Sequence, residues 1–141
     1  MDLTRRRALA LGGTAIAVTL VPISYAQAAT EQTDAAISAF TGGVAPTEGG
    51  IDLTAPEIAE NGNTVPISVE AEGAKRVTVL AAGNPNPGVA TFNFGPLSAP
   101  IGSTRIRLAG TQDVVAVAEM ADGSFRMASR AVKVTIGGCG G

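Results

Sequence analysis

The 141-residue chain has no histidine and no tryptophan, and its only cysteine is Cys139. Without histidine, the chain alone cannot build Cys-His or Ser-His-Asp catalysis, nor the histidine-ligated zinc and copper sites. A single cysteine cannot form an internal disulfide. The glycine pairs at 42–43 and 49–50 lack the strand-to-helix setting of nucleotide-binding motifs, and we interpret them as loops. These absences leave Cys139 as the reactive group that the composition singles out.

The first 28 residues are typical of an export signal. A basic start at Arg5-Arg6-Arg7 precedes an apolar run from Ala8 to Val21, and Ala26-Gln27-Ala28 fits the small-x-small pattern of a cleavage site. The apolar run has about 14 residues, fewer than the ~20 that a membrane-spanning helix needs. Arg5 and Arg6 also favour twin-arginine export, although Ala8 stands where that signal prefers an aromatic residue. We therefore expect residues 1–28 to be removed and the mature protein to work in the periplasm.

The charge balance argues against two classes of partner. The whole chain has 10 Lys+Arg and 12 Asp+Glu; without the expected signal 7 and 11 remain, so the net charge changes from −2 to −4. A protein of this charge is a poor match for nucleic acid or an anionic membrane. About 113 residues would remain, enough for one hydrophobic core without disulfides. An unpaired cysteine in an oxidising compartment indicates intermolecular pairing or a reactive thiol.

Short segments of the mature chain alternate apolar and polar residues. This pattern predicts strands at residues 51–53, 65–70, 76–80, 89–94, 104–108, 114–120 and 124–136. Asn84-Pro85-Asn86-Pro87-Gly88 predicts a loop, and Asp122-Gly123 predicts a tight hairpin turn. One short helix is predicted from Glu31 to Phe40, stopped by Gly42 and packed against the strands. The expected fold class is all-β: an immunoglobulin-like antiparallel β-sandwich with a short N-terminal helix, over residues 29–136.

Glycine surrounds the cysteine. Gly137, Gly138, Gly140 and Gly141 flank Cys139 on both sides. Glycine has no Cβ and cannot offset its ordering entropy by packing, so we expect residues 137–141 to form a flexible arm. At 3.3–3.6 Å per extended residue, five residues could carry the sulfur roughly 16 Å from the last strand. A glycine-flanked cysteine near the chain end has nothing to be buried in, and no affinity tag or linker precedes the arm. A functional thiol is therefore favoured over a buried cysteine or an added handle.

Several stretches resemble one protein family. The glycine-flanked cysteine after Val132-Lys133-Val134-Thr135-Ile136 is similar to the tail of the SoxY family, the sulfur-carrier subunits of the bacterial thiosulfate-oxidising system. The likeness extends over nearly the whole mature chain, through residues 56–62, 64–66, 84–85, 105–107, 119–120 and 122–123.

The resemblance implies a covalent carrier with no cofactor of its own, rather than an enzyme. A haem c-containing partner would couple thiosulfate oxidatively to Cys139, and a manganese-dependent thiosulfohydrolase would then release sulfate. In some organisms a sulfur dehydrogenase oxidises the remaining sulfane sulfur. The resemblance also implies a stable heterodimer with a SoxZ-like subunit. Cys139 would hold every cysteine-bound sulfur intermediate.

The residues themselves predict a weakly activated thiol. A free cysteine thiol has a pKa near 8.5, so only a few per cent is thiolate at neutral pH. No cation flanks Cys139, and Lys133 lies six residues back. We therefore expect partner sites to supply the base, the metal and the electron acceptor. A tethered intermediate has a high local concentration at each partner that the linker lets it reach.

The other charged residues considered are expected at the surface rather than in a catalytic or binding site. Glu57 and Glu60 are expected on a solvated surface, and Arg105 and Arg107 on an exposed sheet face or partner contact rather than in a thiosulfate site. Two further functions stay open. One is an exported thiol module that forms a regulatory intermolecular disulfide through Cys139, and the other is a structural sandwich whose cysteine is incidental.

Overall fold

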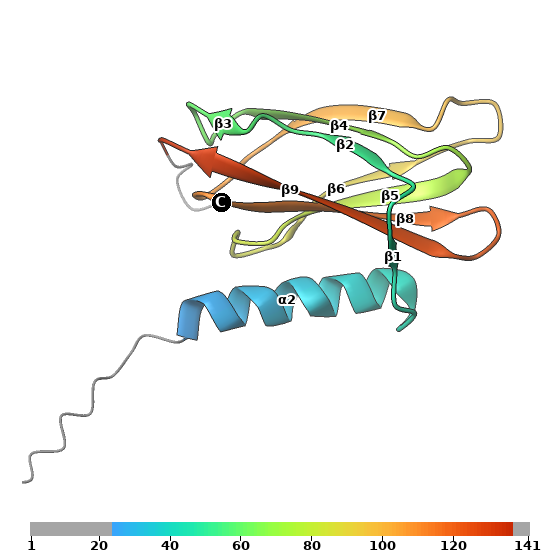
Figure 1. The fold of residues 1–141 in the computed structure, drawn as a ribbon, viewed down its shortest axis with the longest axis horizontal. Coiled ribbons are helices and arrows are strands. Elements are labelled where there is room, and N and C mark those ends of the chain that lie inside the picture. Colours follow the sequence, from blue (N-terminus) through green and yellow to red (C-terminus); the bar gives the residue numbers. More distant parts are fainter. Residues whose placement is uncertain (1–23, 137–141) are drawn as a thin grey trace, which may run out of the picture.

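The computed structural model describes residues 24–136 (Figure 1). The predicted twin-arginine pair, Arg5 and Arg6, and the predicted arm at 137–141 lie outside the described residues. The described part has one helix and nine strands: α2 (Ser24–Thr41), β1 (Thr47–Glu48), β2 (Asp52–Thr54), β3 (Ile58–Ala59), β4 (Val65–Glu70), β5 (Ala74–Ala81), β6 (Gly88–Asn93), β7 (Ile101–Ile106), β8 (Gln112–Met120) and β9 (Phe125–Val134).

The strands form two stacked sheets (Figure 1). The smaller sheet has the order β2-β4-β7, and the larger has the order β1-β9-β8-β5-β6, with β3 also paired to β9. Neighbours are antiparallel except for β1 and β3, which each run parallel to β9. The chain order of β2, β4 and β7 against β5, β6, β8 and β9 is that of strands A, B, E against C, C′, F, G. The predicted immunoglobulin-like β-sandwich is therefore confirmed.

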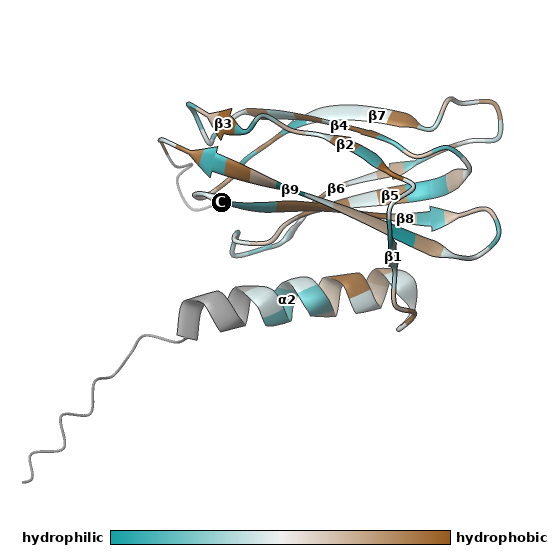
Figure 2. Cartoon of the chain, viewed as in Figure 1, coloured by the Kyte–Doolittle hydropathy of each residue, from teal (hydrophilic) through white to brown (hydrophobic). Residues whose placement is uncertain are grey.

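The hydrophobic core lies between the two sheets. Its fully buried side chains are mostly valines from both sheets, joined by two leucines: Leu53, Val65, Val69, Val77, Val79, Leu108, Val114 and Val132. In β4 the inward residues are buried, whereas Pro66 and Glu70 are exposed. Figure 2 shows hydrophilic and hydrophobic stretches along β9, without the strict alternation of β4. Pro66 is the second residue of β4, and β4 pairs with β2 only from Ser68 onward. Proline has no N–H, but at this position the pairing with β2 loses no hydrogen bond.

The helix covers the outer face of the larger sheet (Figure 1). Ala36, Ile37 and Phe40 contact a second cluster formed by Leu80, Val115, Val117 and Met127. Both faces of β8 are thereby buried, which explains its unbroken apolar run from Val114 to Ala118. Arg76 fixes the end of the helix, because its guanidinium lies 4.3 Å from the centre of the Phe40 ring and forms an ion pair with Glu119. The prediction that the helix packs against the strands is confirmed.

The helix is longer than predicted. It begins at Ser24 rather than at Glu31, because the alanine-rich segment before Glu31 has high helix propensity. It ends at Thr41, and Gly42 follows with φ 67°, as expected for the predicted stop. Because the helix crosses position 28, the end of the export signal stays a prediction. Within the described residues, no helix combines the length and the apolar character required to cross a membrane.

The hairpin between β8 and β9 closes as Asp122-Gly123 predicts. The N–H of Met120 donates to the carbonyl of Ser124 (2.8 Å), and Gly123 adopts φ 86°. Asp122 accepts hydrogen bonds from the Ser124 hydroxyl (2.6 Å) and N–H (2.8 Å). These bonds stabilise the ionised carboxylate and lower the pKa of Asp122 below its ordinary value of 3.8, the hydroxyl contributing most.

The lowered pKa makes the hairpin sensitive to acid. A carboxyl whose pKa is lower in the folded state adds stability above its unfolded pKa, and this stability is lost as the pH falls through the folded value. We expect Ser124→Ala to raise the pKa of Asp122 toward 3.8, because the hydroxyl bond disappears while the N–H bond stays. An NMR titration of the Asp122 carboxyl carbon measures this shift. An unchanged pKa in the variant would show that the hydroxyl has no such role.

Candidate functional site

The chain leaves the body toward Cys139 through Lys133 to Ile136, the last two residues of β9 and the two that follow it, and we call this segment the arm root. The segment 57–62 holds the arm root along one side (Figure 1), where β3 runs parallel to β9. The N–H of Lys133 donates to the carbonyl of Glu57 (2.9 Å), that of Thr135 to Ala59 (3.0 Å), and that of Gly62 to Ile136 (2.8 Å).

A side chain holds the arm root from the other side. The N–H of Val134 donates to the hydroxyl oxygen of Thr111 (3.0 Å), and that hydroxyl lies 3.4 Å from the carbonyl of Val134. The hydroxyl of Thr135 donates to the carbonyl of Glu60 (3.1 Å). Backbone and side-chain bonds therefore fix the arm root on both flanks.

The arm root passes from the core to the surface. Val132 is completely buried, Val134 is half-buried, and Ile136 is 65% exposed. Ile58, on the neighbouring β3, is 59% exposed. Cys139 follows Ile136 by three positions and lies outside the described residues, as do the four glycines of the predicted arm.

The segment 57–62 acts through its backbone. Glu57 and Glu60 are exposed, as predicted, and it is their carbonyl oxygens that bind the arm root. The sequence predicted only a turn-rich link here, because a two-residue strand such as β3 is too short to show alternation. The role of Thr111 was also missed, since an isolated threonine carries no pattern. Among residues 24–136, no group of three or more His, Cys, Asp or Glu side chains is placed to hold a metal ion.

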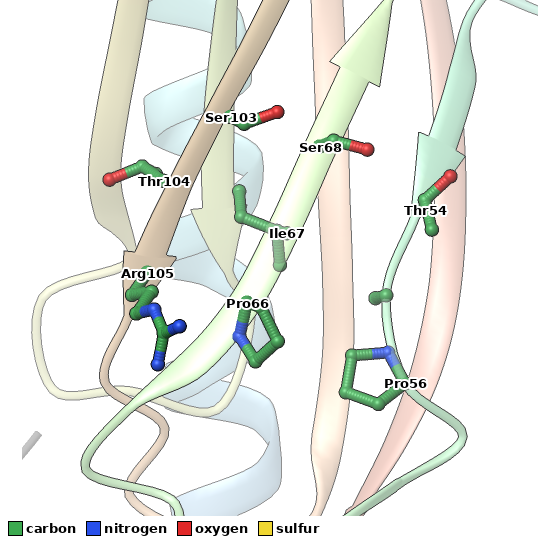
Figure 3. A pocket seen from close by; sticks show the side chains of 9 residues that line it. Thr54, Pro56, Pro66, Ile67, Ser68, Ser103, Thr104 and Arg105 are labelled. Carbon is green, nitrogen blue, oxygen red and sulfur yellow. The ribbon is translucent and has the colours of Figure 1, made fainter.

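Two surface hollows lie beside β7. The larger, of about 570 Å³, is a mainly apolar groove across the smaller sheet. Figure 3 shows Pro56, Pro66 and Arg105 at one end of this groove, and Thr54 and Ser103 nearer the other.

The smaller hollow, of about 390 Å³, is polar. Its polar lining is Asn63, Asn84, Asn86, Arg105 and Arg107, and we call it the Asn–Arg hollow. Arg105 therefore borders both hollows. The predicted exposure of Arg105 and Arg107 is confirmed.

Asn84 is a buried residue of the Asn–Arg hollow whose side chain binds the neighbouring backbone. It is 4% exposed, and its amide nitrogen donates to the carbonyl of Arg107 (2.7 Å). Its carbonyl oxygen accepts from the N–H of Ala109 and from the side-chain amide of Gln112, each at 2.9 Å. The sequence identified Asn84 only as part of a loop; the structure shows that it ties this loop to the segment that follows β7.

Comparisons with known proteins cover most of the chain. A family model described as "Sulfur oxidation protein SoxY" matches residues 37–139, a span that reaches Cys139. Among solved structures, the sulfur carrier protein SoxY from Chlorobium limicola f thiosulfatophilum is 36% identical with a TM-score of 0.70, and the alignment covers 77% of this chain and 97% of that one.

A second structural likeness concerns the fold alone. A superoxide reductase (neelaredoxin) from Ignicoccus hospitalis is 15% identical with a TM-score of 0.54, covering 61% of this chain and 80% of that one. A search of curated protein sequences returned no match. The family model covers most of the chain, and the alignment with the 36% identical carrier covers more than two thirds of both chains. The chain therefore belongs to the SoxY family of sulfur oxidation proteins.

Proposed function

We propose that the chain is a periplasmic covalent carrier of sulfur intermediates in thiosulfate oxidation, with Cys139 as the attachment site. The observation that supports this most strongly is the family match, which runs through the β-sandwich and includes Cys139. The anchored arm root supports it independently, because a tethered cargo needs a firm base beside the tether. Residues 137–141 are the proposed arm, and residues 1–28 the proposed export signal.

The proposed loading step is an oxidative coupling. The Cys139 thiolate and thiosulfate form a sulfur–sulfur bond and give Cys–S–S–SO₃⁻, and two electrons pass to a haem c-containing partner. Hydrolysis of the terminal sulfonate by a manganese-dependent thiosulfohydrolase then consumes one water and releases sulfate and two protons, leaving Cys–S–S⁻. A sulfur dehydrogenase, where present, oxidises that sulfane sulfur. The carrier contributes the tether, while the partners contribute acid–base, metal and redox chemistry.

Partners that act on Cys139 must come close to the arm root. Ile58, which pairs with Lys133, and Ile136 offer them exposed apolar side chains at the arm root. Apolar residues at such a place favour transient contacts with other proteins. We further propose a SoxZ-like subunit as the stable partner in a heterodimer, and neither nucleic acid nor membrane as a partner.

Intact-mass spectrometry tests the proposal against the regulatory disulfide. Protein is isolated, without reductant, from cells grown with thiosulfate and from cells grown without it. We expect sulfane and thiosulfonate adducts on Cys139 only in the thiosulfate-grown sample, in at least tenfold excess over the control, because the cargo derives from thiosulfate. A disulfide-linked species equally abundant in both samples would instead support the regulatory module. An unmodified thiol in both would contradict both functions.

A further inference from the structure

The proposed function leaves the Asn–Arg hollow without a role. The hollow lies where β6 and β7, the end strands of their sheets, come together. None of the residues that line it is Asp or Glu. Its volume of about 390 Å³ accommodates a tetrahedral oxyanion and several waters, each of which occupies about 30 Å³ in the liquid.

The two arginines of the hollow are available to a ligand. Both are exposed, and both line the same hollow. Within residues 24–136, no ion pair engages Arg105 or Arg107, since the salt bridge found there joins Arg76 to Glu119. A guanidinium group has five N–H donors in a planar fork, which suits the paired oxygens of an oxyanion. The asparagine amides of the lining add neutral donors.

The hollow is held in a fixed shape. The bond from Asn84 to the carbonyl of Arg107 and the bond from Ala109 to Asn84 lock the backbone around Arg107. Gln112 joins Gly83 to Asn84: the N–H of Gly83 donates to the side-chain oxygen of Gln112 (2.8 Å), and the side-chain amide of Gln112 donates to Asn84. A site whose donors are already in place loses less entropy on binding than one that must assemble around its ligand.

The hollow also lies next to the arm root. Gly62 joins the two, because its carbonyl accepts from the N–H of Leu108 (2.7 Å) while its N–H donates to Ile136. Asn63 and Arg107, both in the lining, are the chain neighbours of Gly62 and Leu108. Three extended residues span roughly 10 Å, so a group on Cys139 could reach this region from Ile136.

We propose that the Asn–Arg hollow binds a small sulfur oxyanion, either free in solution or carried as the terminal sulfonate on Cys139. Arg105 and Arg107 pair with the anionic oxygens, Asn63 and Asn86 donate further hydrogen bonds, and Asn84 positions Arg107. The sequence favoured a sheet face or a partner contact for these arginines; their gathering in one hollow without acidic residues points to an anion site instead. The carried form rests on the proposed function, whereas the free form does not.

The free form is tested on ¹⁵N-labelled Cys139→Ser protein, which cannot be loaded. Thiosulfate and sulfate are titrated at constant ionic strength, with chloride as the reference anion. We expect saturable amide shifts at Asn63, Gly88 and Arg107, and at least a tenfold loss of affinity in Arg105→Gln/Arg107→Gln. The matched control is Arg130→Gln, which removes an exposed arginine of β9 and should leave the affinity unchanged. Arg105→Lys/Arg107→Lys should restore part of the affinity by keeping the charge.

The carried form is tested on protein with Cys139 converted to its S-sulfonate. A mixed disulfide of Cys139 with thionitrobenzoate is cleaved by sulfite, which bonds to the cysteine sulfur and releases the thionitrobenzoate thiolate. We expect the same amides to shift relative to protein capped with iodoacetamide, and the shifts to vanish in Arg105→Gln/Arg107→Gln.

If the amides shift in only one of the two experiments, the anion site is supported. That experiment then shows whether the anion is free in solution or carried on Cys139. Unshifted amides in both, for variants whose spectra show a folded protein, would overturn the inference. If Cys139 still acquires sulfur adducts in cells, that outcome leaves the proposed function standing. If the hollow binds the anion but Cys139 acquires no sulfur adducts in cells, the proposed function is contradicted and the anion site stands.

Discussion

Replacing Cys139 with serine should abolish thiosulfate-dependent electron flow while leaving the fold unchanged. Serine has nearly the same shape but cannot form the sulfur–sulfur bond on which the proposed loading step depends. The described core contains no cysteine, so we expect the free energy of unfolding to change by less than about 0.5 kcal/mol. The measurement is thiosulfate-dependent cytochrome reduction by the reconstituted system, beside a thermal melt of the isolated variant.

The control for this loss is Arg130→Gln, which changes an exposed charge on β9, outside the arm root. This variant should keep electron flow within about twofold of the unmodified protein, because Cys139 is unchanged and a surface substitution usually changes the free energy of unfolding by no more than ~0.5 kcal/mol. Electron flow that survives in Cys139→Ser at more than a few per cent would contradict the carrier role. A strongly lowered melting temperature in that variant would instead indicate a structural role for the cysteine.

Replacing Asn84 with alanine should strongly destabilise the fold. Its replacement by alanine removes the amide that binds the carbonyl of Arg107, the N–H of Ala109 and the side chain of Gln112. Each buried polar group left without a partner costs about 1–3 kcal/mol. We expect Asn84→Ala to lower the free energy of unfolding by about 2–4 kcal/mol, because water can reach only part of this region. Urea denaturation followed by circular dichroism measures the loss.

Asn86→Ala is the matched control for this substitution. Asn86 lies in the same loop but is exposed, so its loss should change the free energy of unfolding by no more than about 0.5 kcal/mol. Equal losses in the two variants would show that the loop responds to any substitution and that the buried hydrogen bonds of Asn84 are not decisive.

The fold could be predicted from the sequence because its strands are long enough to alternate. Val65 to Glu70 shows three buried and three outward positions, and this pattern identifies both the strand and its inner face. The short strands β1 and β3 were not predicted, because two residues are too few to show an alternation of apolar and polar side chains. The start of the helix was placed too late because the prediction began at Glu31, after the segment interpreted as a signal, whereas the alanine-rich segment before it continues the same helix.

The candidate site could be predicted only in part. The composition led to Cys139, since a lone cysteine in a chain without histidine is conspicuous in the sequence itself. The support around the arm root depends on contacts between segments far apart in the chain, such as those of Gly62 with Leu108 and Ile136. Such contacts between distant backbone groups leave no local signal in composition or spacing. The same holds for Asn84, whose buried hydrogen bonds are invisible in a loop rich in proline.

The proposed carrier role requires that sulfur from thiosulfate becomes covalently bound to Cys139. Its most direct test supplies living cells with thiosulfate whose sulfane sulfur is a heavy isotope, and maps the peptides of the purified protein by mass spectrometry. We expect heavy sulfur on the peptide that contains Cys139, retained after the sulfonate group has been released as unlabelled sulfate. A Cys139 peptide that stays free of the isotope while the cells oxidise the labelled thiosulfate would contradict it.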